Sequence, residues 1–366
     1  MPRVRSLTDA GVRRLRAGAQ LLHRPRRRSV ADLVRYLGAV QAQVPSAAGL
    51  ALRARTEGLT VRRVDRARLH DRSIVLTWAL RGTLHLIAAE DHGWLVPLAT
   101  EPSIANAHRR LREEGVPADA AAGAVRHIEA MLGREGPLSR REIAERLGRR
   151  RIRTGGQAIA HLLWLASAKG VICHGPDRGR TQLFVLCRDW LGEPNRMDQE
   201  AALLELAIRH LTAHGPAAPE DLAFWSGLRI GQARLAWQGI RERLVEVPTI
   251  RGRRWLLRTQ KREAPHGLVR LLPSFDEYLL GWKDRGPAVA DEDWRKVNRG
   301  GGWIHPVVVV DGRVVGTWRA ERTSARVRIE VHPFSALSTA ARRGATAEER
   351  DLAAFWEVPA GERGMP

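Results

Sequence analysis

The chain has 366 residues, of which 61 are Lys or Arg and 40 are Asp or Glu, giving a formal net charge of +21, while 44% of the residues are hydrophobic. This hydrophobic fraction excludes a disordered polycation, and the length predicts several domains. No apolar run reaches the roughly 18 residues of a membrane span, the N-terminus lacks a secretory signal, and two cysteines provide neither a disulfide framework nor a structural zinc site.

The positive charge has two possible origins. All but four of the 61 basic residues are arginine, and GC-rich codons produce such a bias in any protein. Codon bias explains arginine in place of lysine, but not an excess of 21 positive charges, because Asp and Glu also have GC-rich codons. We therefore expect a polyanionic partner, since a basic balance is typical of nucleic-acid binding.

Residues 1–110 form the first predicted domain. The run SVADLVRYLGAV predicts a helix with Ser29 as its cap. The run IVLTWALRGTLHLIA predicts a hairpin that turns at Arg81-Gly82.

Two glutamines lie between this helix and this hairpin. We expect the helix to end within residues 41–44, because Pro45 excludes Val44 from helical geometry, and we expect Ser46 to cap the next helix. Side chains two residues apart share one side only in an extended chain, so Gln41 and Gln43 are placed to point into one space where the helix ends. The alternative is a pair of ordinary surface or capping glutamines.

Two later blocks repeat one order of elements. GPLSRREIAERLG from Gly136 and GPAAPEDLAFWSG from Gly215 share a Gly-Pro turn and predict short helices that start at Ser139 and Pro219. A helix precedes each, and a second helix and a hairpin follow, which is the winged-helix order. SVADLVRYLGAV resembles the short helix, so residues 1–110 provide a third, looser copy before those in 111–192 and 193–262. Such units commonly bind DNA, although they also serve as protein-interaction or structural modules.

Residues 263–366 differ from the preceding blocks because predicted strands outnumber predicted helices. LVRLL, WIHPVVVV, RVVGTW and ARVRIEV predict strands, and Asp311-Gly312 predicts a hairpin. We expect GPAVADEDWRKVNRGGG to form an exposed loop, and two terminal helices near 335–343 and 347–355. The sequence therefore predicts a small barrel-like, β-rich domain that covers the wings, within an α+β protein.

The common catalytic motifs are missing from the sequence, including the P-loop, HExxH and GxSxG. Cys173, His174 and Cys187 fall on one predicted hairpin, and a core pair is favoured over a metal site because a fourth ligand is missing. The acidic clusters at 276–277 and 291–293 are either solvated or helix-starting charges, or the metal ligands of a nuclease. We expect no metal and no cofactor.

Four segments together resemble the AlkZ/YcaQ-type DNA glycosylases, in order and over nearly the whole chain: VQAQVPSAAGLALRAR, TWALRGTLHLIAAEDHGWL, LLPSFDEYLLGWKDR and VVVVDGRVVGTW. The resemblance implies three tandem winged-helix motifs and a C-terminal β domain that form a concave, C-shaped DNA-binding surface. It also implies that Gln41 and Gln43 are the catalytic pair. The glutamine at position 43, the second of the pair, resembles the AlkZ branch of the family.

The activity that this resemblance implies is excision of N-alkylated purines, including bulky adducts and interstrand crosslinks, in base-excision repair or genotoxin self-resistance. The expected partner is double-stranded DNA that carries alkylated purines, with no membrane involved. We expect a monomer in the bacterial cytoplasm. The main alternative is a non-enzymatic winged-helix transcription regulator.

The implied chemistry suits neutral carboxamides. Alkylation at N7 makes guanine a cationic leaving group, so the protein needs mainly to place a water against an oxocarbenium-like sugar. A carboxamide oxygen accepts a hydrogen bond from such a water. None of the four lysines (169, 261, 283 and 296) is an obvious nucleophile, although Lys283 lies in GWKDR, so we expect hydrolysis by water without strand cleavage.

Further site residues follow from the same segments. Trp78, Arg81, Thr83 and His85 alternate along the hairpin and either line the cavity or pack across strands, packing being favoured for Trp78. Asp276, Tyr278 and Arg285 either organise the cleft or, as we favour, join the β domain to the wings through an Asp–Arg pair. The candidate phosphate contacts are Arg153, Arg178, Arg180, Arg251, Arg253 and Arg254.

Overall fold

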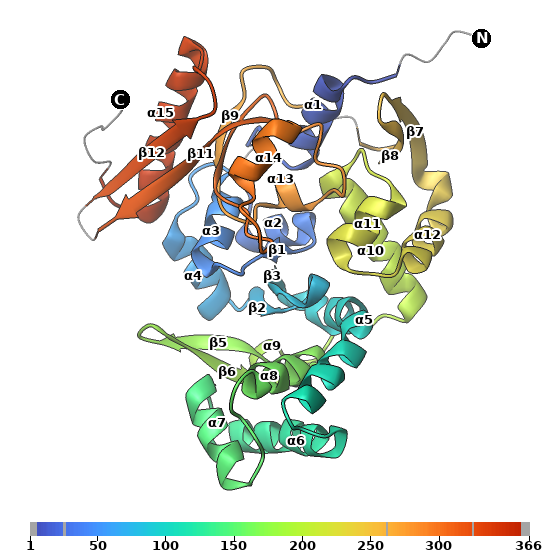
Figure 1. Ribbon diagram of the computed structural model, residues 1–366, viewed down its shortest axis with the longest axis vertical. Coiled ribbons are helices and arrows are strands. Elements are labelled where there is room, and N and C mark those ends of the chain that lie inside the picture. Colours follow the sequence, from blue (N-terminus) through green and yellow to red (C-terminus); the bar gives the residue numbers. More distant parts are fainter. Residues whose placement is uncertain (1–5, 25–26, 261–262, 324–325, 360–366) are drawn as a thin grey trace.

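Three stretches of the chain repeat one order of elements, namely a helix, a short strand or bridge, two helices and a hairpin (Figure 1). The computed structural model describes residues 6–24, 27–260, 263–323 and 326–359. The first stretch comprises α2 (Val30–Leu37), β1 (Val40–Gln41), α3 (Pro45–Arg53), α4 (Val61–Leu69), β2 (Ile74–Trp78) and β3 (Leu84–Ala88). The second comprises α6 (Ala118–Glu135), β4 (Leu138–Ser139), α7 (Arg140–Arg149), α8 (Ala158–Ala168), β5 (Ile172–Arg178) and β6 (Thr181–Leu186). The third comprises α10 (Gln199–His214), α11 (Pro219–Ser226), α12 (Ile230–Gly239), β7 (Leu244–Thr249) and β8 (Gly252–Leu257).

The short strand pairs with the second strand of the hairpin in each stretch. β1 pairs with β3, β4 pairs with β6, and Ala217 makes a single bridge to Trp255 in β8. This pairing corrects the alignment of the first copy, because β1 follows α2 whereas β4 precedes α7. Helix α2 therefore corresponds to α6 and α10, not to the short helices α7 and α11.

Helix α2 ends earlier than expected, at Leu37. Gly38 follows with φ of +81°, and a Cβ there would lie 3.1 Å from the indole of Trp225. Glycine is needed for both the backbone conformation and the close contact. The chain then extends, so that Gln41 lies on a strand opposite His85 and not on a helix end.

Helix α3 begins at Pro45, with Val44 as its N-cap residue. The prediction that Ser46 caps this helix is wrong, because Ser46 lies within the first turn, after a proline at the first helical position. The predicted cap of α2 is confirmed, since the Ser29 hydroxyl accepts a hydrogen bond from the Asp32 N–H at 3.0 Å.

A six-stranded sheet joins the first two hairpins in the order β1-β3-β2-β5-β6-β4. The two hairpins meet where Leu76 of β2 pairs with His174 of β5. The predicted turn at Arg81 and Gly82 is confirmed, with φ of +55° and +70°. Helix α5 (His92–Glu113) connects the first stretch to the second, and the short α9 (Cys187–Leu191) follows β6.

The C-terminal sheet is an open antiparallel meander and not a barrel. Its order is β12-β11-β10-β9, formed by β9 (Val269–Leu272), β10 (Val307–Val310), β11 (Arg313–Arg322) and β12 (Val327–Pro333). The predicted turn at Asp311 and Gly312 is confirmed, with φ of +48° and +78°. A helix, and not another strand, covers the edge strand β9. Its residue Glu348 accepts a hydrogen bond from the Leu271 N–H at 3.0 Å and so satisfies a main-chain donor of that edge.

That covering helix, α15 (Thr339–Trp356), replaces the two terminal helices that we predicted. Gly344 lies inside it, where a Cβ would come within 2.5 Å of the Val269 side chain. The glycine therefore permits close packing on β9 and does not interrupt the helix. The expected loop before β10 is also partly helical, because residues 291–293 form the first turn of α14 (Asp291–Val297), where acidic side chains favour a helix.

The two faces of the C-terminal sheet contact two different cores. Leu271 and Val308 pack with the core of α2, α3 and α4, whereas Leu272 and Val307 pack with the core of α10, α11 and α12. Helix α1 (Asp9–Ala19) packs beside α10, and a separate core fills the second stretch. The short helix α13 (Glu277–Leu280), which follows β9, thus lies between the first and third stretches.

Candidate active site

Gln41 lies on the face of the sheet that also carries His85. The two residues are directly opposite in the β1–β3 pairing, and directly opposite residues project to the same face. Gln41 is only 7% exposed, whereas Gln43 is exposed at the bend between β1 and α3. The glutamines therefore differ in environment, one anchored and one accessible. A cavity of about 220 Å³ adjoins the same segment, but Ala42, Pro45 and Ser46 line it instead of the glutamines.

Four residues form a closed hydrogen-bonded circuit through side-chain and main-chain groups, called here the Gln41 ring: Gln41, Arg81, Trp225 and Glu277. Arg81 Nη2 donates to Gln41 Oε1 at 2.8 Å, and its other terminal nitrogen donates to the main-chain carbonyl of Trp225. Glu277 Oε1 accepts the Gln41 N–H at 2.9 Å, and its Oε2 accepts the Trp225 indole N–H at 2.8 Å. Gln41 and Trp225 are thus each held by both charged residues.

The two charges of the ring compensate each other without touching. Burial raises the pKa of Glu277, and the positive charge of Arg81 opposes that shift. Burial likewise lowers the pKa of Arg81, against the effect of Glu277. Arg81 reaches this position because Gly227, at φ of +83°, lets the α11–α12 turn approach the Arg81 backbone, where a Cβ would lie 3.2 Å away. The hairpin of the first stretch therefore meets the third stretch at the ring.

His85 is completely buried, and its Nδ1 lies 2.9 Å from the Thr83 carbonyl oxygen. Burial, followed by the charge of Arg81, lowers the pKa of His85 to about 3. The imidazole is therefore neutral near pH 7 and donates through Nδ1. In the described part of the chain its Nε2 has no hydrogen-bond partner. Thr83 donates through its hydroxyl to the Leu80 carbonyl at 3.2 Å.

Trp78 packs as we favoured. Its ring lies 5.2 Å from that of His174 and 6.1 Å from that of Phe184, measured between centroids. These contacts join the two hairpins of the six-stranded sheet, so Trp78 supports the junction between the first and second stretches.

Asp276 forms the expected Asp–Arg pair, but with a different arginine. Its two oxygens accept from Arg55 at 2.7 and 2.9 Å, and both side chains are fully buried. Arg285 instead lies over the rings of Phe224 and Trp294. The pairing with Arg285 is therefore wrong, whereas an Asp–Arg contact does join the C-terminal region to the first stretch.

Tyr278 has a structural contact as well. Its hydroxyl donates to the Gly312 carbonyl at 2.6 Å, and burial raises the pKa of the phenol. It thereby fixes α13 to the β10–β11 turn.

Sequence reasoning missed two members of the ring, Trp225 and Glu277. The sequence pattern predicts Glu277 as a solvated or helix-starting charge, or as a metal ligand beside Asp276, and not as a buried acceptor of hydrogen bonds. A usable signal was present, because an acidic residue within the apolar run SFDEYLL is costly to bury without donors around it. Trp225 lies in the second Gly-Pro repeat and carries no local signal of its contact with Glu277.

Other candidate chemistry receives little support from the geometry. Within the described ranges, no group of three or more His, Cys, Asp or Glu side chains is arranged to hold a metal ion. Cys173 and Cys187 are buried free thiols, and Cys187 Sγ lies 3.5 Å from His92 Nε2. Cys187 begins α9 and does not lie on the hairpin strand. Lys261 lies outside the described residues.

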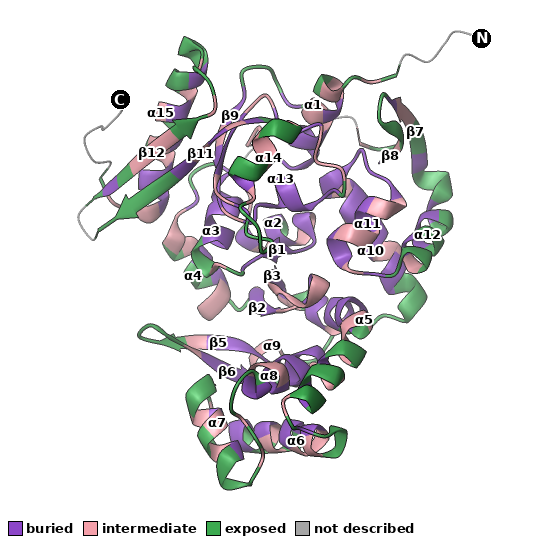
Figure 2. Cartoon of the chain, viewed as in Figure 1, coloured by how far each residue is buried: buried purple, intermediate pink, exposed green. Residues whose placement is uncertain are grey.

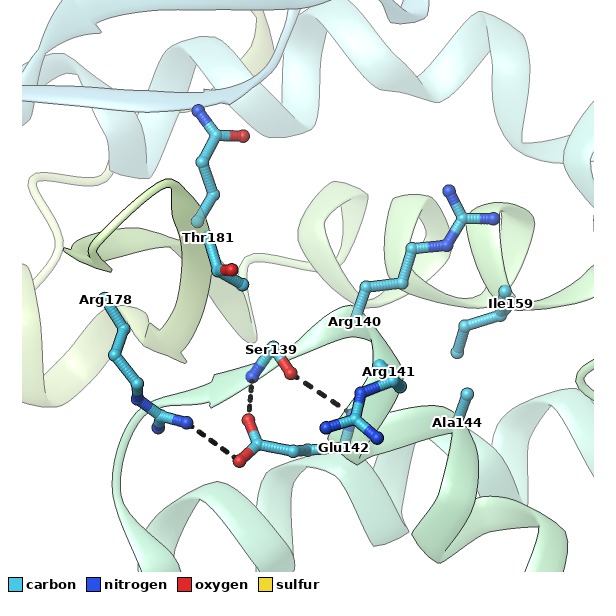
Figure 3. A pocket seen from close by; sticks show the side chains of 9 residues that line it. Ser139, Arg140, Arg141, Glu142, Ala144, Ile159, Arg178 and Thr181 are labelled. Carbon is cyan, nitrogen blue, oxygen red and sulfur yellow. Dashed lines mark hydrogen bonds and ion pairs between the residues drawn. The ribbon is translucent and has the colours of Figure 1, made fainter.

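Three candidate phosphate contacts belong to the second stretch. Arg153, Arg178 and Arg180 are all exposed, the last two at the exposed tip of the β5–β6 hairpin (Figure 2). Arg178 also pairs with Glu142 at 2.9 Å, and both residues line a surface cavity of about 610 Å³. Figure 3 shows Arg140 extending away from Glu142 on another side of this cavity, which leaves its guanidinium unengaged by that carboxylate.

The remaining candidates lie around the β7–β8 hairpin and differ in accessibility. The side chain of Arg253 is 75% exposed, and Arg251 is 40% exposed while held by Asp9 at 2.8 Å. Arg254 is only 15% exposed and faces Asp221 and Asp284 at 3.8 and 3.9 Å. The geometry therefore does not support a phosphate contact from Arg254.

None of the helices in the described ranges has both the length and the hydrophobicity that crossing a bilayer requires.

The chain is similar to known proteins over most of its length. A family model described as "DNA glycosylase AlkZ-like" matches residues 34–355. The chain is 34% identical over 314 residues to an interstrand DNA cross-link repair glycosylase of Streptomyces sahachiroi, covering 79% of this chain and 82% of that protein. It is also similar to the solved structure of the DNA glycosylase AlkZ of the same organism, with a TM-score of 0.81, 28% identity, and coverage of 98% of this chain and 100% of that one.

Proposed function

Because the chain belongs to the AlkZ-like DNA glycosylase family, whose members hydrolyse N-glycosyl bonds in DNA, we propose that it excises N7-alkylated purines. The name of the Streptomyces relative, an interstrand DNA cross-link repair glycosylase, supports interstrand crosslinks as its substrates. Membership of this family supports a glycosylase and not a non-enzymatic transcription regulator. The observation that carries the proposal is the pair formed by the anchored Gln41 and the exposed Gln43 beside it.

The proposed reaction is attack of water on the sugar C1′. The bond from C1′ to the base breaks, its electron pair leaves with the base, which becomes neutral, and the proton lost by the water passes to solvent. One lone pair of Gln41 Oε1 is engaged by Arg81, which leaves the other to accept from that water. Gln43 is accessible for a second contact to the same water or to the substrate. Such positioning is sufficient because N7 alkylation has already made the base a good leaving group. The products are a free base and an abasic site in an intact strand.

We further propose that the three repeated stretches are winged-helix units, in residues 1–110, 111–192 and 193–262, followed by a C-terminal unit in 263–366. The shared pairing of the short strand or bridge with the second hairpin strand supports this division. The net charge of +21 supports a duplex as the ligand of these units, arranged around it as a C. In such units the hairpin tips, which here carry Arg178, Arg180 and Arg253, contact the phosphate backbone.

Substitution of the glutamines tests the catalytic proposal. A duplex with one N7-methylguanine is incubated with excess protein, and alkali then breaks the strand at each abasic site. We expect Gln41→Ala and Gln43→Ala each to lower the single-turnover rate constant by on the order of 100-fold, because the water is no longer positioned. Duplex affinity, measured by fluorescence anisotropy, should stay near the wild-type value.

An exposed glutamine outside the site provides the matched control. Gln199→Ala, at the start of α10, should excise at the wild-type rate. Release of the base at an undiminished rate by both single variants and by the double variant would refute the assigned role of the pair.

A further inference from the structure

The Gln41 ring restrains Gln41 at two separate points, its main chain and its carboxamide. The restraints come from residues far apart in sequence, because Arg81 lies on the hairpin of the first stretch and Glu277 on α13. We propose that Arg81 and Glu277 are positioning residues that hold Gln41 in its catalytic orientation. The inference rests on the catalytic role proposed above for Gln41.

Arg81 determines which way the carboxamide faces. A guanidinium has only donors, so it contacts the oxygen of Gln41 and excludes the orientation in which the amide nitrogen takes that place. Its second donor is held by the Trp225 carbonyl, which prevents the guanidinium from swinging away. The remaining lone pair of Gln41 Oε1 therefore has one defined direction.

Glu277 fixes the backbone from which that carboxamide extends. Both of its oxygens must accept, one from the Gln41 N–H and one from the Trp225 indole. An ionised carboxylate satisfies two donors at once, whereas a glutamine at this position would direct an NH₂ group at one of them. The carboxylate is thus required by the geometry of the ring, although its burial is unfavourable.

A double-mutant cycle tests whether the two residues act through Gln41. Arg81→Ala and Glu277→Gln are each prepared alone and combined with Gln41→Ala. Single-turnover rate constants are measured on the N7-methylguanine duplex as a function of enzyme concentration, so that the maximal rate and the half-saturating concentration are separated. We expect each single variant to lower the maximal rate roughly 10- to 100-fold, with the half-saturating concentration nearly unchanged.

The combined variants provide the decisive measurement. If both residues act by positioning Gln41, adding either substitution to Gln41→Ala lowers the rate by no more than about twofold. Wild-type rates in both single variants, or full additivity in the double variants, would overturn the proposal. Wild-type activity in Gln41→Ala would instead refute the catalytic role on which the inference rests, so the two failures are distinguishable.

Loss of stability has its own control in the same region. Trp318→Phe removes a buried hydrogen bond, from the indole to the Leu272 carbonyl at 2.7 Å, without touching the ring. This variant should melt at a lower temperature and keep the wild-type rate constant. A comparable loss of rate in Trp318→Phe would assign the effects of Arg81→Ala and Glu277→Gln to general destabilisation and overturn the positioning role.

Discussion

At the scale of single residues, buried charges in this protein are compensated by specific partners across the fold. Arg55 and Asp276 are fully buried and joined by two hydrogen bonds, although 221 positions separate them in the chain. Arg55 also donates to Gln20 and to the Ala51 carbonyl, so that its terminal nitrogens are engaged. Transferring two charges from water into the interior costs free energy, which their mutual attraction and hydrogen bonds offset. Removing one of the two residues leaves the other charge buried and uncompensated.

We therefore expect Asp276→Asn to lower the free energy of unfolding by about 3 to 5 kcal/mol, as is typical when one partner of a buried pair is lost. Urea denaturation followed by circular dichroism measures the change. Arg62→Ala provides the comparison, because Arg62 also pairs with a carboxylate, that of Glu357, but is 80% exposed. Its stability should stay near that of the wild type, and equal losses in the two variants would contradict this account.

At the scale of elements, the junction of the first two hairpins is built from aromatic packing around a histidine. The rings of His174, Trp78 and Phe184 are mutual neighbours, and neither ring nitrogen of His174 has a hydrogen-bond partner in the described part of the chain. Burial lowers the pKa of His174 to about 4. Burial in the junction therefore favours the neutral form of this side chain.

The pH dependence follows from that shift. A histidine whose pKa is lower in the folded state binds its proton in the unfolded state first, so stability is complete above pH 6.5 and is lost as the pH falls towards 4. The contribution of His174 amounts to about 1.4 kcal/mol per pH unit within this window. His174→Phe should remove that part of the acid slope in urea titrations between pH 6.5 and 4. Above pH 7 the slopes of variant and wild type should coincide, and an unchanged acid slope would contradict the prediction.

At the scale of the whole molecule, the excess of positive charge is unevenly available to a ligand. The side chain of Arg253 on the β7–β8 hairpin is 75% exposed and has the exposed carboxylate of Glu246 at 3.4 Å, whereas its neighbour Arg254 is 15% exposed and faces the carboxylates of Asp221 and Asp284. Of these adjacent arginines, Arg253 is accessible to a phosphate group, whereas Arg254 takes part in ion pairs within the fold.

The salt dependence of duplex binding separates these two roles. Each phosphate contact contributes about 0.9 to the slope of log affinity against log salt concentration. Arg253→Ala should reduce the slope by about that amount and keep wild-type stability, whereas Arg254→Ala should leave the slope unchanged and lower the melting temperature. Anisotropy titrations at four salt concentrations make the comparison, and equal slopes for the two variants would contradict the assignment.

Local sequence signals determined the parts of this protein that depend on neighbouring residues. Ser29 caps a helix, and Arg81-Gly82 and Asp311-Gly312 turn hairpins, because caps and tight turns follow from the donors, acceptors and φ values of a few adjacent residues. The α+β class and the repeated order of elements followed from periodicity and turn residues, whereas the family was indicated by the resemblance of four segments to known glycosylases. The sequence of α2 is locally similar to those of the short helices α7 and α11. Local signals therefore did not show that α2 corresponds to α6 and α10 instead.

The tertiary structure alone decided what surrounds Gln41. Its strand conformation arises from pairing with β3, and its hydrogen-bond partners come from the hairpin tip and from α13, positions 40 and 236 residues away. The same holds for Asp276, whose partner is Arg55 and not the nearby Arg285. Contacts of this kind depend on how the cores on the two faces of the C-terminal sheet bring distant segments together, and no local pattern encodes that arrangement.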